Sequence, residues 1–189
     1  DEANEAALAH AEADGLTYIH PFADPRVIAG QGTIALEMLE DAPEIDTLIV
    51  AIGGGGLISG VATAAKLLKP GIKVIGVEPT GAPTHHAARA AGHLVTLDKI
   101  ETAAGTLAPR TSAQLNFELI SKNVDELVLV SDAEMKAAAE WLWEETGLSA
   151  ELSGAAAQAA LMTGKVSAPA GSTVAVIVCG AGTDGLPAA

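Results

Sequence analysis

Leu48-Ile49-Val50-Ala51-Ile52-Gly53-Gly54-Gly55-Gly56-Leu57 is the stretch of this chain that decides its fold. It places four glycines between a short apolar run, which predicts a buried strand over Asp46 to Ile52, and a helix from Leu57 to Leu68. Pro70-Gly71 ends this helix, and Lys73 to Glu78 predicts a second strand. Strand, helix and strand in this order form a βαβ unit with parallel strands and a right-handed crossover.

The same alternation of helices and strands continues on both sides of this unit. We expect helices over Glu5 to Ala13, about Gly32 to Leu39, Thr84 to Ala91, Gln114 to Lys122, Ser131 (a capping box with Glu134) to Thr146, and Gly154 to Met162, and strands over Leu94 to Leu97, Glu126 to Val130 and Thr173 to Val178. This order predicts an α/β fold, with a doubly wound, mostly parallel sheet and helices on both of its faces.

Composition narrows the class of protein. The chain has 189 residues, of which 49% are apolar and only 3% aromatic, enough for a large core of aliphatic side chains. A formal charge of −14 argues against nucleic acid or an anionic membrane as the partner. One cysteine excludes an internal disulfide. With no run of membrane-spanning length and an acidic N-terminus, we expect a cytoplasmic protein; without an initiator methionine, we expect a fragment of a longer one.

The four glycines, Gly53 to Gly56, are named the glycine loop. Backbone without Cβ atoms brings successive N–H groups close to an anion, and the positive end of the following helix adds to this attraction. The loop lacks the Gly-Lys-Ser/Thr ending of a triphosphate-binding P-loop, which favours a small monophosphate. The alternative is a tight turn that only packs the helix on the strand.

A dinucleotide site is a rival interpretation. Glu78 ends the strand after the glycine loop, where such folds place the acid that binds a ribose. The glycine-rich sequence motif of dinucleotide sites is incomplete, however. Ser59 or Ile58 stands where its third glycine or alanine belongs, depending on which two glycines of the loop are aligned with its first two.

Three further sites carry reactive side chains. Cys179 follows the last strand, so a parallel sheet would bring it to the same edge as the glycine loop; alternatively it is a small buried apolar residue. Glu151 precedes an alanine-rich helix and either faces a ligand or complements the helix dipole. His85 and His86 lack a companion at metal-ligand spacing, which predicts a solvated loop pair.

The motifs resemble those of the threonine/serine dehydratase and serine racemase family of pyridoxal-phosphate enzymes, which have the fold-type II architecture. The resemblance rests on the order and spacing of Val50 to Gly60, Val74 to Pro79, Pro21 to Pro25, Gly30 to Thr33, Asn116 to Glu118 with Val124 to Glu126, and Glu151 with Ser153 to Ala156. It implies that the chain is the C-terminal half of such an enzyme. Residues 1–30 would then be the end of the small domain and the crossover, and residues 31–189 the large cofactor-binding domain.

The resemblance also implies the roles of individual residues. Gly53 to Gly56 and the Leu57 amide would bind the phosphate of pyridoxal 5'-phosphate, and Cys179 would face its pyridine nitrogen. Glu151 and Gly105 would lie near the cofactor ring. Members of the family that bind a divalent cation use residues matching Glu78, Ala82 and an aspartate, but Thr84 takes the place of that aspartate here, so a cation is doubtful.

The implied reaction is the removal of ammonia and water from threonine or serine to give a 2-oxo acid. No catalytic residue is expected within this chain, because the family's Schiff-base lysine would lie upstream of Asp1. The alternatives are a serine racemase or hydroxyaspartate dehydratase on the same scaffold, or a noncatalytic nucleotide-binding or regulatory domain. The expected partners are a small amino-acid substrate, the N-terminal half of the enzyme and further copies in a homo-oligomer.

Overall fold

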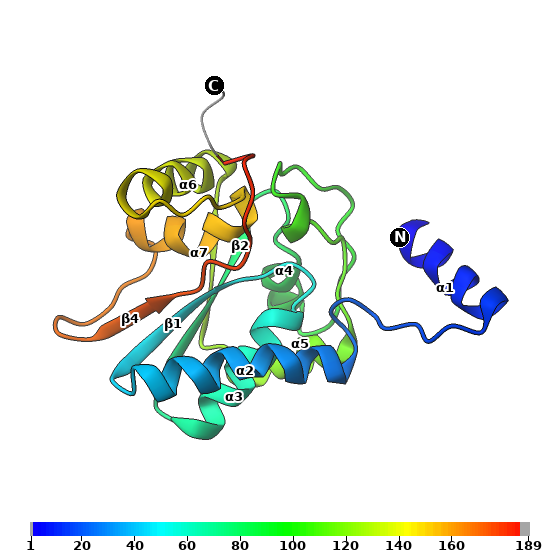
Figure 1. The fold of residues 1–189 in the computed structure, drawn as a ribbon, viewed down its shortest axis with the longest axis horizontal. Coiled ribbons are helices and arrows are strands. Elements are labelled where there is room, and N and C mark those ends of the chain that lie inside the picture. Colours follow the sequence, from blue (N-terminus) through cyan, green and yellow to red (C-terminus); the bar gives the residue numbers. More distant parts are fainter. Residues whose placement is uncertain (1, 186–189) are drawn as a thin grey trace.

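A parallel sheet of four strands forms the centre of the molecule (Figure 1). The computed structural model describes residues 2–185. The strands are β1 (Ile45–Ala51), β2 (Lys73–Pro79), β3 (Glu126–Val130) and β4 (Thr173–Val176), in the spatial order β3-β2-β1-β4. All neighbouring strands are parallel, which confirms the predicted α/β class.

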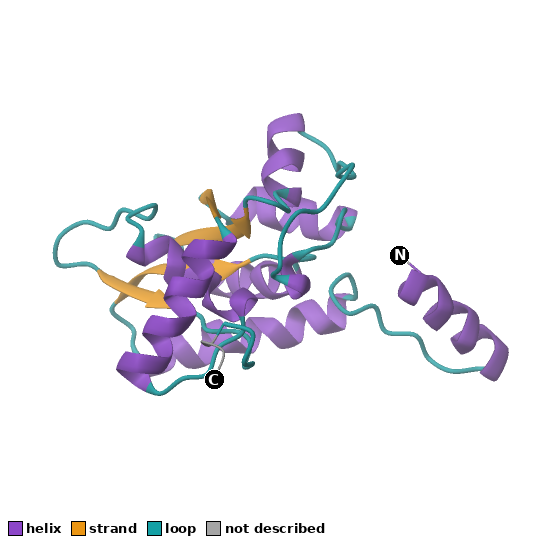
Figure 2. Ribbon diagram, turned by 90° about the horizontal axis from the view of Figure 1, so that it is seen from above, coloured by secondary structure: helices purple, strands orange, loops and turns teal. Residues whose placement is uncertain are grey.

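Helices cover both faces of this sheet, as Figure 2 shows with strands in orange between helices in purple. The helices are α1 (Glu2–Asp14), α2 (Pro25–Asp41), α3 (Gly56–Leu68), α4 (Thr84–Ala91), α5 (Gln114–Asn123), α6 (Asp132–Thr146) and α7 (Leu152–Met162), with a short 3-10 helix, η1, at Gly105–Leu107. The doubly wound arrangement was therefore predicted correctly.

Alternate residues of β1 enter two different hydrophobic cores. Ile49 and Ala51 join a core with α6 and α7, whereas Leu48 and Val50 join a second core with α2, α3 and α5. All four side chains are at most 3% exposed, because helices cover the strand from both sides. The period of two in a fully apolar strand thus divides the core into two layers.

Local signals account for several helix ends. Ser131 and Glu134 form the predicted capping box, and Gly147 closes α6 with a φ of 73°. Asp24 caps α2 by accepting a hydrogen bond from the Arg26 amide, with Pro25 in the first turn. The predicted start of this helix near Gly32 was therefore too late, because Asp24 and Pro25 begin the helix.

The predicted strand at Leu94 to Leu97 was wrong. This segment is a loop that contacts its neighbour through hydrogen bonds from the Leu97 amide to the Arg110 carbonyl and from Arg110 Nε to the Leu97 carbonyl. A short, largely apolar segment becomes a strand only beside a partner strand, and here the sheet ends at β3.

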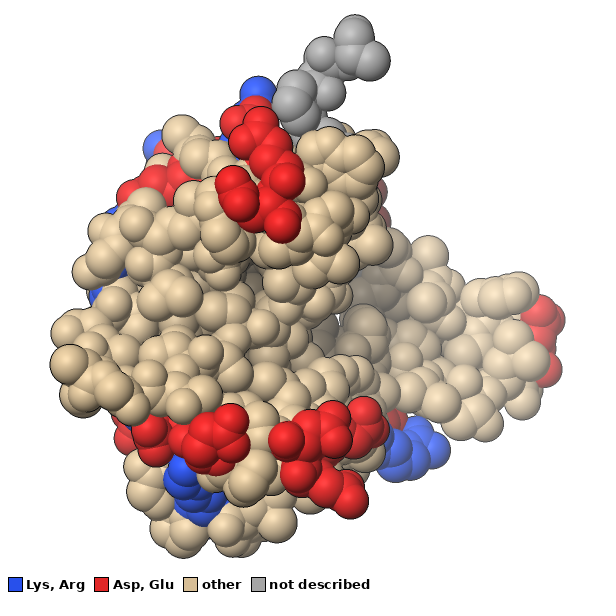
Figure 3. All heavy atoms as spheres, turned by 60° about the vertical axis from the view of Figure 1, so that its left-hand side comes forward, with Lys and Arg blue, Asp and Glu red and all other residues tan. Residues whose placement is uncertain are grey.

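Helix α1 lies apart from the sheet and its covering helices in Figures 1 and 2, and none of its residues is buried. The division at residue 30 stays a prediction. The face in Figure 3 carries acidic residues around a largely uncharged middle, in agreement with the net charge of −14. Within residues 2–185, no helix combines the length and the apolar character needed to span a membrane.

Candidate functional site

A cavity of about 690 Å³ opens at the carboxyl ends of β1 and β4. The chain leaves β1 toward β2 on one side, while β4 lies on the other side, so this is the point at which the strand order reverses. Ligands of open α/β sheets bind at such a switch point. The cavity is lined by Pro21, Phe22, Val27, Gln31, Ile34, Ala51, the glycine loop, Leu57, Thr106, Leu107, Glu151, Ile177, Val178 and Cys179.

The amides of the glycine loop and of Leu57 are free of protein acceptors. Among residues 2–185, none accepts a hydrogen bond from the N–H groups of Gly53, Gly54, Gly55, Gly56 or Leu57. Gly55 is the N-cap of α3 and has no side chain to cap the helix. These residues line the cavity, and their free N–H groups lie at the positive end of α3, which is the arrangement of a helix-terminal anion site.

The carbonyl side of the loop is held by α5 and the segment before it. The Gly54 carbonyl accepts hydrogen bonds from Asn116 Nδ2 and Ser112 Oγ, both at 2.8 Å. Since C=O and N–H point in opposite directions across a trans peptide, the Gly55 N–H is directed away from these two donors. Asn116 also donates to the Phe22 carbonyl at 2.9 Å, so one buried amide fixes two walls of the cavity.

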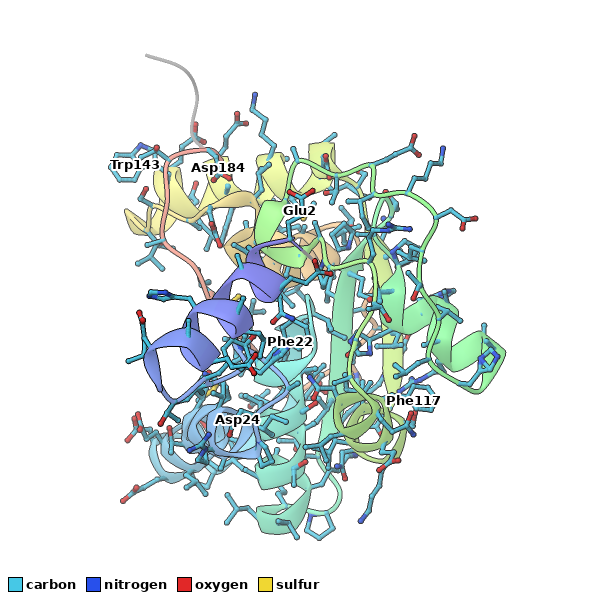
Figure 4. All side chains as sticks on the ribbon, turned by 90° about the vertical axis from the view of Figure 1, so that its right-hand side faces the viewer. Glu2, Phe22, Asp24, Phe117, Trp143 and Asp184 are labelled. Carbon is cyan, nitrogen blue, oxygen red and sulfur yellow. The ribbon has the colours of Figure 1, made fainter. Side chains whose placement is uncertain are left out.

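Each glycine of the loop also has a packing reason. A Cβ atom would lie 2.4 Å from the Thr106 carbonyl oxygen at Gly53, 2.3 Å from the Phe22 ring at Gly54 and 2.9 Å from Phe22 Cα at Gly56, while Gly55 has a φ of 94°. Figure 4 shows Phe22 near the middle of the view, on the segment between α1 and α2. The packing interpretation and the anion-site interpretation therefore both describe this loop.

Glu151 and Cys179 are brought together by two segments that run side by side. The Glu151 amide donates to the Gly180 carbonyl at 3.2 Å, the Gly182 amide donates to the Ser149 carbonyl at 3.3 Å, and Ala150 pairs with Ala181. Glu151 is the N-cap of α7 but makes no side-chain cap bond. Its Oε1 instead accepts a hydrogen bond from Thr106 Oγ1 at 3.0 Å. The carboxylate thus belongs to the cavity wall.

Cys179 is exposed to the open cavity rather than buried in the core. The protein atoms around the thiol nevertheless raise its pKa above the ordinary value, first by desolvation and then through the negative charge of Glu151. At neutral pH the side chain is therefore a neutral thiol with a weak donor.

Gly105 lies beside the cavity without lining it. It is exposed and begins η1, and the next two residues, Thr106 and Leu107, form the wall. Leu57 and all four residues of the glycine loop do line the cavity. Thr106, Phe22 and Asn116 were missed as site residues, because their contacts join segments far apart in the sequence.

Glu78 lies outside this cavity in a buried cluster with α4. Its two carboxylate oxygens accept hydrogen bonds from the His85 and His86 amides at 2.7 and 2.8 Å. Burial raises the pKa of Glu78 to about 7, against these hydrogen bonds and the charge of Arg89. The Ala82 carbonyl accepts from the Thr84 amide. Across the described part of the chain, no group of three or more His, Cys, Asp or Glu side chains is arranged to hold a metal ion.

The prediction of a solvated histidine pair was wrong for His85. Both histidines belong to α4, and only His86 is exposed, whereas His85 is 1% exposed. Desolvation lowers the pKa of His85 to about 4, so its ring is neutral. Its Nε2 would be 2.9 Å from a Cβ atom at Gly55, which places the ring against the glycine loop. The ring is buried because it lies on the face of α4 that packs against the glycine loop.

Comparison with known proteins agrees with this geometry. The chain is 42% identical over 184 residues to the L-threonine ammonia-lyase of Thermotoga maritima, covering 97% of this chain and 45% of that protein. It is 42% identical over 171 residues to the phenylserine dehydratase of Ralstonia pickettii, covering 90% and 52%. The structure of maize serine racemase matches with a TM-score of 0.89 at 37% identity, covering 95% and 56%.

This chain spans about half the length of the relatives that it matches. The family model described as "Pyridoxal-phosphate dependent enzyme" matches residues 1–180. The chain therefore belongs to the family of pyridoxal-phosphate dependent enzymes, in the group that includes threonine ammonia-lyases and serine racemases.

Proposed function

We propose that the protein containing this chain binds pyridoxal 5'-phosphate in the cavity and removes ammonia and water from threonine or serine to give a 2-oxo acid. The observation that carries the proposal is the row of free amides from Gly53 to Leu57 at the start of α3. A phosphate accepts several such hydrogen bonds and is further stabilised by the helix dipole. Names of the relatives, a threonine ammonia-lyase and a phenylserine dehydratase among them, support elimination from a β-hydroxy amino acid.

The cavity fits the remainder of the cofactor. A volume of about 690 Å³ lies within the usual range for a cofactor together with a small substrate. With the phosphate on the glycine loop, the cavity lining also offers a thiol at Cys179 and a carboxylate at Glu151. The cofactor, when bound, supplies the electron sink that stabilises negative charge on the substrate α-carbon.

The residues of this chain have separate tasks in the proposal. The glycine-loop amides hold the phosphate, and Cys179 makes a neutral contact with the pyridine nitrogen. Glu151, beside the ring, holds or transfers a proton at its Oε2 atom, and Gly105 lies near the ring. Among the described residues, no lysine lines the cavity, so we place the base for the α-proton in the part of the enzyme outside this chain. Alone, these 189 residues should lack lyase activity.

Three parts of the interpretation stay predictions. A divalent cation at Glu78 and Ala82 would share those oxygens with the amide hydrogen bonds that they now accept, and Thr84 Oγ1 donates to the Pro109 carbonyl instead of offering a carboxylate. A cytoplasmic location and a homo-oligomeric state also stay predictions.

The test uses the full-length protein with Gly54→Val and a matched control, Gly71→Val, at a glycine with no atom near its Cβ position. The added side chain at Gly54 would displace the Phe22 ring and obstruct the free amides, so the dissociation constant for the cofactor should rise about tenfold or more, or about 1.4 kcal/mol. Fluorescence titration with pyridoxal 5'-phosphate measures the affinity, and release of 2-oxobutyrate from threonine measures the activity.

The outcomes separate the interpretations. A wild-type protein that binds no pyridoxal 5'-phosphate would contradict the proposed function. Equal affinities in the two valine variants, with folding retained, would mean that the glycine loop is only a packing turn. Conversion of L-serine to D-serine without oxo-acid release would favour the racemase alternative, which the likeness to maize serine racemase supports.

A further inference from the structure

The side chain of Glu151 is not engaged by its own helix. Glu151 is the N-cap residue of α7, a position at which shorter side chains accept a hydrogen bond from the second or third amide of the helix. Here the amide of Leu152 donates to Asp184 Oδ1 at 3.1 Å, and Glu151 makes no cap bond. Asp184, labelled near the top of Figure 4, comes from the segment after β4. The end of α7 is therefore capped without using the Glu151 side chain.

Thr106 provides the hydroxyl that Glu151 uses instead. Its Oγ1 donates to Glu151 Oε1 at 3.0 Å across 45 positions of sequence. The backbone of Thr106 packs closely against the glycine loop, because its carbonyl oxygen would be only 2.4 Å from a Cβ atom at Gly53. Leu107, the next residue, is 5% exposed and anchors η1 in the core. Thr106 therefore connects the glycine loop to the carboxylate.

The opposite side of the carboxylate is closed by glycine. A Cβ atom at Gly180 would lie 2.4 Å from Glu151 Oε1, and one at Gly182 would lie 2.9 Å from Glu151 Cβ. Oε1 is thus confined between the Thr106 hydroxyl and the Gly180 backbone. Among residues 2–185, none donates a hydrogen bond to Oε2, which leaves this oxygen available for a ligand.

We propose that Thr106 is a positioning residue of the site, whose hydroxyl holds Oε1 of Glu151 so that Oε2 is presented to the bound cofactor and substrate. The inference rests on the proposed function, because it assigns the orientation of a carboxylate within that site. A hydrogen bond from a hydroxyl to a charged carboxylate is among the stronger side-chain contacts, and it restricts the rotamers of a flexible side chain.

The test compares Thr106→Val, which keeps the shape and removes the hydroxyl, with Thr106→Ser, which keeps the hydroxyl. Thr111→Val is the matched control, because Thr111 Oγ1 also makes one hydrogen bond of 3.0 Å, to the Val95 carbonyl, away from the cavity. In the full-length protein, Thr106→Val should lower kcat for threonine about tenfold with KM changed less than about twofold. Thr106→Ser and Thr111→Val should keep kcat within about threefold of the wild type.

A second measurement does not depend on turnover. The absorption spectrum of bound pyridoxal 5'-phosphate should change in the same way in Thr106→Val and Glu151→Gln, and adding Thr106→Val to Glu151→Gln should produce no further change in spectrum or kcat. Circular dichroism checks that every variant is folded.

Three results would overturn the inference. If Thr106→Ser were as impaired as Thr106→Val, the hydroxyl could not be the group that positions Glu151. If the effects of Thr106→Val and Glu151→Gln added in the double variant, Thr106 would not act through Glu151. If Thr106→Val kept the kcat and the spectrum of the wild type, Thr106 would have no positioning role, and the proposed function would still stand. A wild type that binds no cofactor would overturn both.

Discussion

Gly60 marks the closest approach of α2 and α3, and Gly60→Ala tests how these helices form one wall of the cavity. A Cβ atom at Gly60 would lie 2.1 Å from the Ile28 carbonyl oxygen and 2.7 Å from the Gly32 amide nitrogen. Both of these atoms belong to the backbone of α2, so no side-chain rotation can relieve the overlap. The two helices would have to separate by more than 1 Å to restore an ordinary van der Waals contact.

The cost can be isolated with Gly30→Ala as the control. Gly30 lies in α2 with nothing near its Cβ position, so alanine there should gain helix propensity, about 1 kcal/mol, without a clash. Gly60→Ala makes the same gain in α3 but also overpacks the interface, at about 1–3 kcal/mol. Because the propensity gains cancel, the difference between the two variants should equal the cost of the clash, and the short distance of 2.1 Å places that cost near the upper end, about 3 kcal/mol.

Urea unfolding, followed by the circular dichroism of the helices, measures the free energy of unfolding of both variants. Gly60→Ala should be the less stable variant and Gly30→Ala at least as stable as the wild type. Equal stabilities of the two variants would refute the argument, since the backbone contact at Gly60 would then carry no cost.

Substitutions at two further residues test charges, one in the site and one in an ion pair near the surface. Cys179→Ser should retain oxo-acid release because it keeps a neutral contact, whereas Cys179→Asp should lose most of it by placing a second carboxylate beside Glu151; full activity of Cys179→Asp, measured at equal cofactor occupancy, would contradict the assigned role. Burial alone would raise the pKa of Asp125, but hydrogen bonds from Lys66 and Val74 lower this pKa below its ordinary value of 3.8. The carboxylate therefore stabilises the folded protein above pH 3.8, and this stability is lost as the pH falls through the lowered pKa of the folded state. Lys66→Met should therefore move the midpoint of acid unfolding to higher pH, and an unchanged midpoint by circular dichroism would contradict this.

Local signals in the sequence were sufficient for the centre of the fold. The apolar run of β1, the glycine loop and α3 follow one another within about 20 residues, and each is defined by neighbours a few positions away. The capping box of Ser131 and Glu134 is local for the same reason. Elements of this kind, and the cofactor family that their motifs resemble, could therefore be predicted before the structure.

Contacts between distant segments were decided only by the tertiary structure. The order β3-β2-β1-β4 puts Cys179 beside the glycine loop and exposes it, although its position after a core strand was equally consistent with a buried residue. His85 is buried because α4 packs against the loop, and Leu94 to Leu97 has no strand to pair with. The hydrogen bond between Thr106 and Glu151 depends on how η1 and α7 meet.

The range of the interactions explains why some features could be predicted from the sequence and others were decided only by the tertiary structure. Helix propensity, capping and strand periodicity depend on residues within a few positions, so the sequence alone determined the α/β framework and the location of the glycine loop. Burial and side-chain hydrogen bonds depend on which surfaces the strand order brings together, so the exposure of Cys179, the neutral buried ring of His85 and the orientation of Glu151 were decided by the packed structure.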